Sequence, residues 1–360
     1  MMKIEKKRIA YLDVLRILSM FFIVLIHVSG SMAWYNTIPK SRSWQFLNLL
    51  DGISRFSVPI FLMISGCIFL NLKREITHSQ LLHKNIKRIA IAFFTWSLVY
   101  ALYEYWAIPG IAKSVVIGMF FAGHYHMWFL PCIVGMYLIT PLLRMWAKDE
   151  RKLRYFLILT IIFAILIPSV LDFFKAFKNI LPVAIWNIMK KVQTTYLRST
   201  FEFPLGLTVY FVLGYYLDQY QLDKTKRICL YSVALIVNIL TSLASGWLSF
   251  HFNKPMVFNY SYTSINNFLF AIAIFVFIKQ VLKNKYISNH NLLVKWSNLM
   301  FAVYLVHVLF VHILIERAHV NILWPNGLIG PILVSIIIFI LSNIVAFILS
   351  KIPLVNKYCM

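Results

Sequence analysis

The sequence has 360 residues, of which 61% are apolar and only 13% carry a charge. A soluble domain carries roughly twice that share of charged residues. Apolar stretches of about 18 or more residues, the length of a membrane helix, recur along the whole chain. The net charge of +23 fits basic residues that flank membrane spans better than a nucleic-acid surface. We therefore expect a protein embedded in the lipid bilayer, with no nucleic-acid partner.

The apolar stretches predict an all-α polytopic membrane bundle of about ten transmembrane helices. No soluble stretch is long enough to form a second domain, so residues 1–360 are treated as one membrane domain. The predicted spans cover residues 11–34, 50–71, 87–107, 127–146, 154–172, 203–218, 227–248, 262–282, 298–316 and 327–350.

The distribution of basic residues predicts the orientation of these spans. With ten spans both termini lie on one side, and the loops of that side hold most of the Lys and Arg. Short loops rich in these residues face the cytoplasm, so both termini are predicted to be cytoplasmic. The long loop 173–202 then lies outside, and its apolar piece Ile180–Ile188 is either an interfacial helix or a lid.

The first predicted span carries three polar side chains, Asp13, Arg16 and His27. Eleven residues separate Arg16 from His27, almost three whole helical turns, so both point the same way about 16 Å apart along the axis. Taken alone, Arg16 fits snorkelling with Asp13 as its partner, and His27 fits an interhelical hydrogen bond. Together they form a polar track across the membrane, and intramembrane charges usually mark function.

The second predicted span places Arg55 about one turn inside the outer boundary, at a depth similar to that of His27. At that depth its guanidinium would hold an anionic or carbonyl group. Pro59 permits a kink, and Ser65 with Gly66 permits close approach of another helix. We expect packing to be the role of Ser65 and Gly66.

A basic cluster, Lys84, Lys87 and Arg88, precedes the third predicted span on the cytoplasmic side. It would bind the phosphates of a nucleotide-containing donor. The competing interpretation is ordinary enrichment of basic residues at the cytoplasmic face.

Two histidines, His124 and His126, open the fourth predicted span at the outer face. Their spacing suits a pair of metal ligands, but no third ligand lies nearby in the sequence, so we expect no metal. Contact with an acceptor, or a hydrogen-bonded pair, is the preferred interpretation. The other candidates for contact with substrate lie near the outer ends of spans or share an inward face: Trp128, Glu104, Tyr304 and His307.

Several enzyme and transporter classes leave no signature in the sequence. It contains no P-loop, GxGxxG, GxSxG or HExxH motif, which argues against an ATP-driven pump, a dinucleotide enzyme and a serine hydrolase. A transporter or flippase of lipid-linked sugars fits the spans and the intramembrane charges. That class predicts inverted repeats, and the two halves share no arrangement of Arg and His.

Four segments together resemble the membrane acyltransferase 3 family. Leu12-Asp13 with Arg16 and His27 is similar to its first helix, and the segment from Ser57 to Gly66 is similar to its phenylalanine-rich helix. His126 to Arg144 resembles the branch of bacterial surface-polysaccharide O-acetyltransferases. Trp296-Ser297 followed by Tyr304 and His307 is similar to a late Tyr-x-x-His helix.

The resemblance implies a bacterial inner-membrane enzyme with acetyl-CoA, or another acyl-CoA, as its cytoplasmic donor. The acceptor would be a cell-surface saccharide or lipid-linked glycan. His27 would be the catalytic histidine, as general base or transient acyl carrier. Arg16 with the basic cluster would engage the donor, although lysines stand where the family often has arginines. In the transfer reaction, Arg55 would stabilise the oxyanion that develops on the carbonyl oxygen of the acyl group. A further alternative to an enzyme is a sensor that binds acyl-CoA without turnover.

Overall fold

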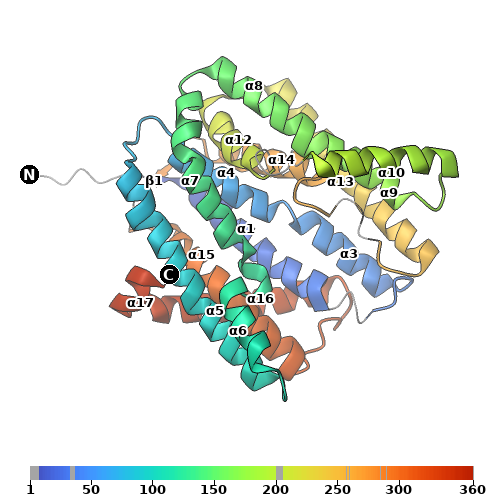
Figure 1. The fold of residues 1–360 in the computed structure, drawn as a ribbon. Helices are drawn as coiled ribbons and strands as arrows, with labels where there is room; N and C mark the ends of the chain where they lie inside the picture. The colour runs from blue at the N-terminus through green and yellow to red at the C-terminus, as the bar shows by residue number, and fades with distance from the viewer. Residues whose placement is uncertain are drawn as a thin grey trace, which may run out of the picture.

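The structure is a computed structural model that describes residues 8–32, 37–199, 206–256, 258, 260–283, 285–288 and 290–359. The predicted all-α membrane bundle is confirmed (Figure 1). Within the described residues, the strands are two short segments, β1 (Arg8–Ile9) and β2 (Tyr286–Ile287), which pair antiparallel with Arg8 opposite Ile287. This pairing ties the start of the first helix to the connection between two late helices.

Helices make up almost all the rest of the described chain. In order they are α1 (Ala10–Ile26), η1 (His27–Met32), α3 (Arg42–Ser54), α4 (Ser57–Phe69), η2 (Gln80–Ile86), α5 (Lys87–Ala107), α6 (Lys113–Ala122), η3 (Tyr125–Trp128), α7 (Phe129–Ala147), α8 (Glu150–Thr160), η4 (Ile161–Leu166), α9 (Ile167–Ala176), α10 (Val183–Arg198), α12 (Thr208–Gln219), α13 (Lys224–Phe252), α14 (Ile265–Val281), α15 (Leu292–Val311), η5 (His312–Arg317), α16 (Ile329–Ser350) and α17 (Pro353–Tyr358). The η segments are π-helical, except for η3, which is a 3₁₀ turn.

Among the described residues, eight helical segments are long and apolar enough to cross a membrane, and each overlaps a predicted span. The two other predicted spans correspond to shorter helices, α12 and α14. Residues 203–205 of one predicted span and 33–34 of another lie outside the described part. α12 is only about 18 Å long, but nine of its twelve residues are buried, so other helices shield most of it from lipid.

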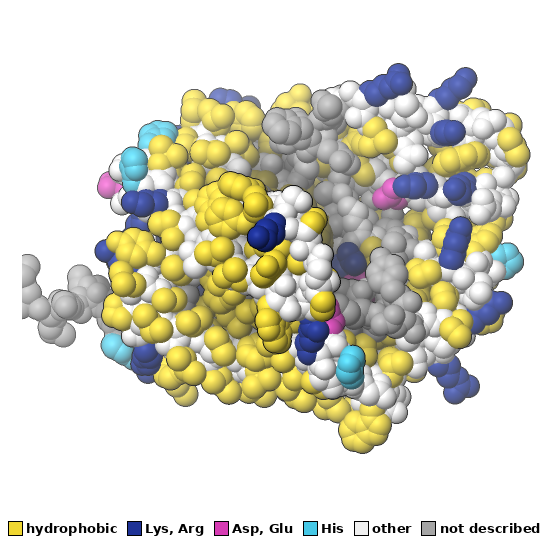
Figure 2. Space-filling view, turned by 60° about the horizontal axis from the view of Figure 1, so that its bottom comes forward, with side chains coloured by type: hydrophobic (Ala, Val, Ile, Leu, Met, Phe, Trp, Pro, Cys, Tyr) yellow, Lys and Arg dark blue, Asp and Glu magenta, His cyan; other side chains and the backbone are white. Residues whose placement is uncertain are grey.

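The long helices turn apolar side chains outward, as a protein dissolved in lipid requires. On α13 and α16 the exposed side chains in mid-helix are Leu, Ile, Val and Phe. Figure 2 shows hydrophobic side chains over much of one face, with Lys and Arg most frequent toward its two opposite margins. The chain is a multi-pass membrane protein.

Helix α1 lies at the centre of the bundle, in contact with α3, α4, α14, α15 and α16 (Figure 1). α4 and α12 approach each other closely. A methyl group added at Gly66 would meet the Phe211 carbonyl oxygen at 1.7 Å, and one at Gly214 would meet that of Met63 at 2.1 Å. Packing of Gly66 against another helix is thereby confirmed.

Proline explains the break between α3 and α4. Pro59 is the third residue of α4 and has no backbone N–H to donate to the carbonyl of Arg55. The helix ends at Ser54 and restarts at Ser57. The predicted kink is therefore found, at the turn before the proline.

Two regions predicted as loops contain helices. Within 173–202, α9 continues to Ala176, and α10 forms a helix over Val183–Arg198. This helix overlaps the apolar piece Ile180–Ile188, for which an interfacial helix or a lid was expected. Its last turn is anchored where the Tyr196 hydroxyl donates to the Phe163 carbonyl (2.5 Å). α6, packed along α5, was not predicted. The side of the membrane on which these elements lie stays a prediction.

Candidate functional site

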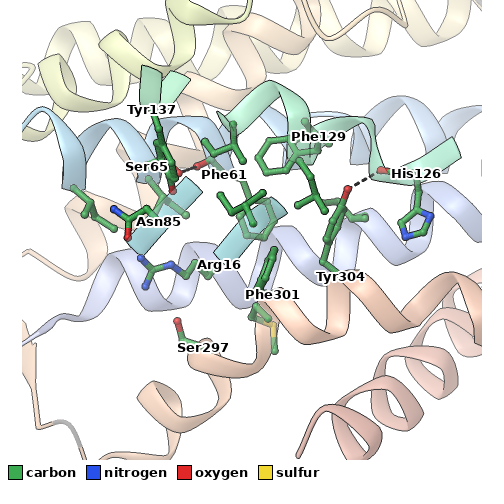
Figure 3. A pocket seen from close by; sticks show the side chains of 18 of the residues that line it. Arg16, Phe61, Ser65, Asn85, His126, Phe129, Tyr137, Ser297, Phe301 and Tyr304 are labelled. Atoms are coloured by element: carbon green, nitrogen blue, oxygen red, sulfur yellow. Dashed lines mark hydrogen bonds between the residues drawn. The ribbon is translucent and has the colours of Figure 1, made fainter. Parts of the chain in front are cut away.

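A cavity of about 460 Å³ runs along α1 and brings Arg16 and His27 to one space. The spacing predicted that these two side chains point to the same side of the helix. This is found, because α1 stays regular up to Ile26. In Figure 3, Arg16, Asn85 and Ser297 lie at one end of this cavity, and Tyr304 and His126 lie toward the other. His27 stands at that second end.

The Arg16 end of the cavity is built around one buried carboxylate. Asp13 is 1% exposed, and its Oδ1 accepts hydrogen bonds from Arg8 Nη2 (2.6 Å), Arg16 Nη1 (3.0 Å) and Ser297 Oγ (2.6 Å). Arg8 also donates to Asn298 Oδ1 (2.8 Å). Two guanidinium groups thus face one carboxylate, which fixes their positions and leaves a positive charge in excess. Such a cluster favours an anionic ligand.

The predicted basic cluster contributes only in part to this end. Asn85 and Arg88 line the cavity, and the Arg88 guanidinium lies 5.6 Å from the centre of the Phe301 ring. Lys84 and Lys87 are exposed and are not among the lining residues. The structure therefore brings one of the three predicted cations, Arg88, to the cavity.

The wall between the two ends is apolar and aromatic. Five residues from the three helices α4, α7 and α15 line it: Phe61, Ile64, Phe129, Ile133 and Phe301. A polar group moved along this wall would lose hydration without gaining partners, so the cavity suits a flexible chain with few charges between its ends.

At the other end, His27 is surrounded by rings. Its ring centre lies 5.1 Å from that of His307, 5.5 Å from Tyr125 and 6.3 Å from His126. The Tyr125 hydroxyl is 3.4 Å from His27 Nδ1. His27 is also the first residue of the π-helical segment η1, and such local widenings are frequent at functional sites.

Hydrogen bonds fix the orientation of His307. Its Nδ1 lies 2.8 Å from the Tyr304 carbonyl oxygen, and because a carbonyl only accepts, this nitrogen carries the proton. In the neutral ring Nε2 then holds a lone pair. This nitrogen is buried and has no hydrogen-bond partner in the described part of the chain. The Tyr304 hydroxyl donates to the His126 carbonyl (2.7 Å), which ties α15 to η3.

Arg55 lies outside the cavity lining, contrary to the open position that its depth suggested. Its Nη2 pairs with the fully buried Asp51 (2.8 Å), and its Nη1 donates to the Tyr260 carbonyl (2.8 Å). The guanidinium also lies 4.8 Å from the Tyr260 ring centre. Asp51, four residues earlier in the sequence, thus forms an ion pair with Arg55.

The other predicted residues divide between two places. Trp128, His126 and Tyr304 line the cavity, and the Trp128 ring stacks on Tyr262 with centres 5.5 Å apart. Glu104 is not in the lining; its Oε1 lies 3.7 Å from His124 Nε2.

Sequence reasoning missed several residues of the cavity lining, notably Arg8, Asn85 and Ser297. It also missed Tyr125, which contacts His27. Arg8 belongs to a basic N-terminal run that looks like ordinary topology. Its function as a partner of Asp13 depends on the β1–β2 pairing. Of these residues, Ser297 could have been found from the sequence, because it belongs to the Trp296-Ser297 motif that the resemblance uses.

The comparisons with known proteins agree with this architecture. A family model for acyltransferase 3, described as an acyltransferase domain, matches residues 9–351. No curated protein and no solved structure matches the chain significantly. The match covers Arg16, His27 and every long helix. This chain therefore belongs to the acyltransferase 3 family of membrane acyltransferases.

Proposed function

We propose that the protein transfers an acetyl group from cytoplasmic acetyl-CoA to a hydroxyl of a cell-surface or lipid-linked saccharide. The observation that carries this proposal is the single cavity that joins a cationic end, at Arg8 and Arg16, to an imidazole end at His27. A binding site with charge at one end and a proton acceptor at the other suits a phosphorylated acyl thioester.

The cationic end is the proposed donor entrance. It lies near the N-terminus, on the side that the basic loops assign to the cytoplasm. The phosphates of coenzyme A would bind to Arg8, Arg16 and Arg88. Its pantetheine arm is a flexible chain of modest polarity, and it would extend along the aromatic wall. The roughly 16 Å between Arg16 and His27 along α1 is comparable to the reach of such a chain.

The imidazole end is the proposed reaction centre. The acceptor oxygen attacks the thioester carbonyl carbon while its proton passes to His27. The carbon–sulfur bond breaks as the carbon–oxygen ester bond forms, and the thiolate of coenzyme A leaves with the proton returned by the imidazolium. The ring centres of His307 and His27 are 5.1 Å apart. After a small rotation of either ring, the lone pair on His307 Nε2 would accept a hydrogen bond from His27 and orient its ring. Trp128 and Tyr262 offer aromatic faces to a sugar ring at this end.

Label transfer tests this proposal. Membranes that contain the native glycans would be supplied with radiolabelled acetyl-CoA, and label in polysaccharide and glycolipid would be counted for wild type, His27→Ala and Arg16→Ala. Two exposed residues remote from the cavity, His251 and Arg154, give matched alanine controls. We expect label with wild type and both controls, and a loss of 100-fold or more with His27→Ala.

Two outcomes would overturn the proposal. Full transfer by His27→Ala at matched expression would remove His27 from the chemistry. Absence of label with wild type in acceptor-rich membranes would favour a transporter or flippase of lipid-linked sugars over an acetyltransferase.

A further inference from the structure

We propose that the chain binds a divalent transition-metal cation of the zinc type between Glu104, His124 and His312. One ligand atom from each residue lies within 4.8 Å of the other two. The three residues come from the last turn of α5, the loop before η3 and the first position of η5. The fold thereby supplies the third ligand that is missing near His124 in the sequence.

The donor set matches the chemistry of an open zinc site. Two imidazole nitrogens and one carboxylate hold zinc in catalytic sites and leave a fourth position for water. His124 Nε2 and Glu104 Oε1 are 3.7 Å apart. Two ligands that are each about 2.0 Å from a tetrahedral zinc ion are about 3.3 Å apart. Small side-chain rotations would therefore close the site around a cation.

The histidine His312 has the environment of a metal ligand. Its Nδ1 lies 2.6 Å from Glu316 Oε1, so the carboxylate holds this nitrogen in its protonated form. His312 is only 6% exposed, and its Nε2 is buried without a hydrogen-bond partner within the described residues. A buried polar atom without a partner calls for an explanation. A cation on Nε2 would complete the carboxylate–histidine–metal arrangement common in zinc proteins.

The histidine His124 has a corresponding outer partner. Its Nδ1 lies 2.9 Å from His126 Nδ1, so one of these two nitrogens carries the shared proton. A cation on His124 Nε2 would require that proton to stay on His124 Nδ1, which then donates to His126. The neutral His126 ring would consequently carry its own proton on Nε2. The metal would thus select the tautomer of a residue that lines the cavity.

Helix contacts hold the three ligands in place. The Tyr100 ring stacks on His124 with centres 4.4 Å apart, and its hydroxyl donates to the Leu305 carbonyl (2.8 Å). Arg317 donates to the Ala107 carbonyl at the end of α5. α5 is therefore fastened to α15 and η5 on both sides of the cluster, which is the rigidity that a metal site needs.

This site depends on its own ligands and does not depend on the proposed acetyl transfer. It differs from the cavity, since Glu104, His124 and His312 are not among the lining residues. The link between the two runs through His126 and Tyr125, which surround His27.

Metal binding by the purified protein tests the inference directly. The full chain, carrying an affinity tag without histidine, would be treated with EDTA in detergent and titrated with Co²⁺, then with Zn²⁺. We expect one Co²⁺ per chain, visible absorption of a low-coordinate site, and displacement by Zn²⁺. His312→Asn and Glu104→Gln should weaken binding at least 100-fold, and Glu316→Gln by roughly 10- to 100-fold. His251→Asn, an exposed histidine on α13, should bind as wild type does.

The melting temperature of the wild-type protein, measured with and without zinc, tests the site even if a variant fails to fold. Zinc should raise the melting temperature of EDTA-treated wild type, because a ligand that binds only the folded state stabilises it. Wild type that binds no Co²⁺ at millimolar concentration and gains no stability from zinc would overturn the proposal. Binding of Co²⁺ by folded His312→Asn with wild-type affinity would overturn it equally.

Discussion

The contact between α4 and α12 gives a prediction with a magnitude set by the structure. Gly66→Ala adds a methyl group 1.7 Å from the Phe211 carbonyl oxygen, and this oxygen belongs to the backbone. A carbon and a carbonyl oxygen in contact are normally about 3.3 Å apart. The two helices would have to separate by roughly 1.5 Å, because a backbone carbonyl within a helix cannot rotate away.

Overpacking of a close-packed interior costs about 1–3 kcal/mol, and this backbone clash belongs at the upper end. The higher helix propensity of alanine stabilises the folded state by up to ~1 kcal/mol. The net loss in the free energy of unfolding is therefore about 2 kcal/mol. Gly135 in α7 gives the matched control, because a methyl group there meets nothing within 4 Å. Gly135→Ala should therefore be neutral or slightly stabilising.

Intrinsic tryptophan fluorescence during heating of the detergent-solubilised protein would measure the difference. We expect Gly66→Ala to melt roughly 5 °C below Gly135→Ala. Phe61 and Ser65 on α4 also line the cavity, so the separation should lower acyl transfer as well. Equal melting temperatures for the two variants would refute the helix contact on which this reasoning rests.

Three further changes test individual contacts of the cavity. Arg8→Ala should raise the KM for acyl-CoA about 10-fold with little change in kcat, because in the proposed complex Arg8 would bind donor phosphates and touch no reacting atom; an unchanged KM would contradict that. Tyr304→Phe removes one hydrogen bond to the His126 carbonyl (2.7 Å) and should lower stability by ~1 kcal/mol, measured by melting. His307→Asn should lower kcat by 10-fold or more, while His307→Gln, whose amide reaches the position of Nε2, should retain more activity; equal losses would exclude a function for Nε2.

The spans could be predicted from the sequence because the bilayer thickness sets the length of an apolar helix. α12 and α14 are shorter than this length, and α12 is largely buried by its neighbours. Helix periodicity likewise placed Arg16 and His27 on one face, because the helix between them is regular. These inferences depended only on local geometry.

Contacts between distant segments could not be predicted in this way. Arg55 was expected to hold a ligand group, but it pairs with Asp51 and Tyr260 and lies outside the cavity lining. Which face of a helix meets a cavity depends on packing, so Asn85 was overlooked beside Lys84. The cluster of Glu104 with His312 joins residues more than 200 positions apart, and no local pattern reveals it.

The central claim is that an acyl group passes from a donor at the Arg16 end to an acceptor at the His27 end, across the membrane. Sealed vesicles of opposite orientation test it most directly, because acetyl-CoA does not cross a bilayer. Inverted vesicles expose the cytoplasmic face, and labelled acetyl-CoA outside them should acetylate glycan within the lumen, with no transfer by His27→Ala. Equal labelling of sealed right-side-out vesicles, or labelling that persists in His27→Ala, would contradict the account.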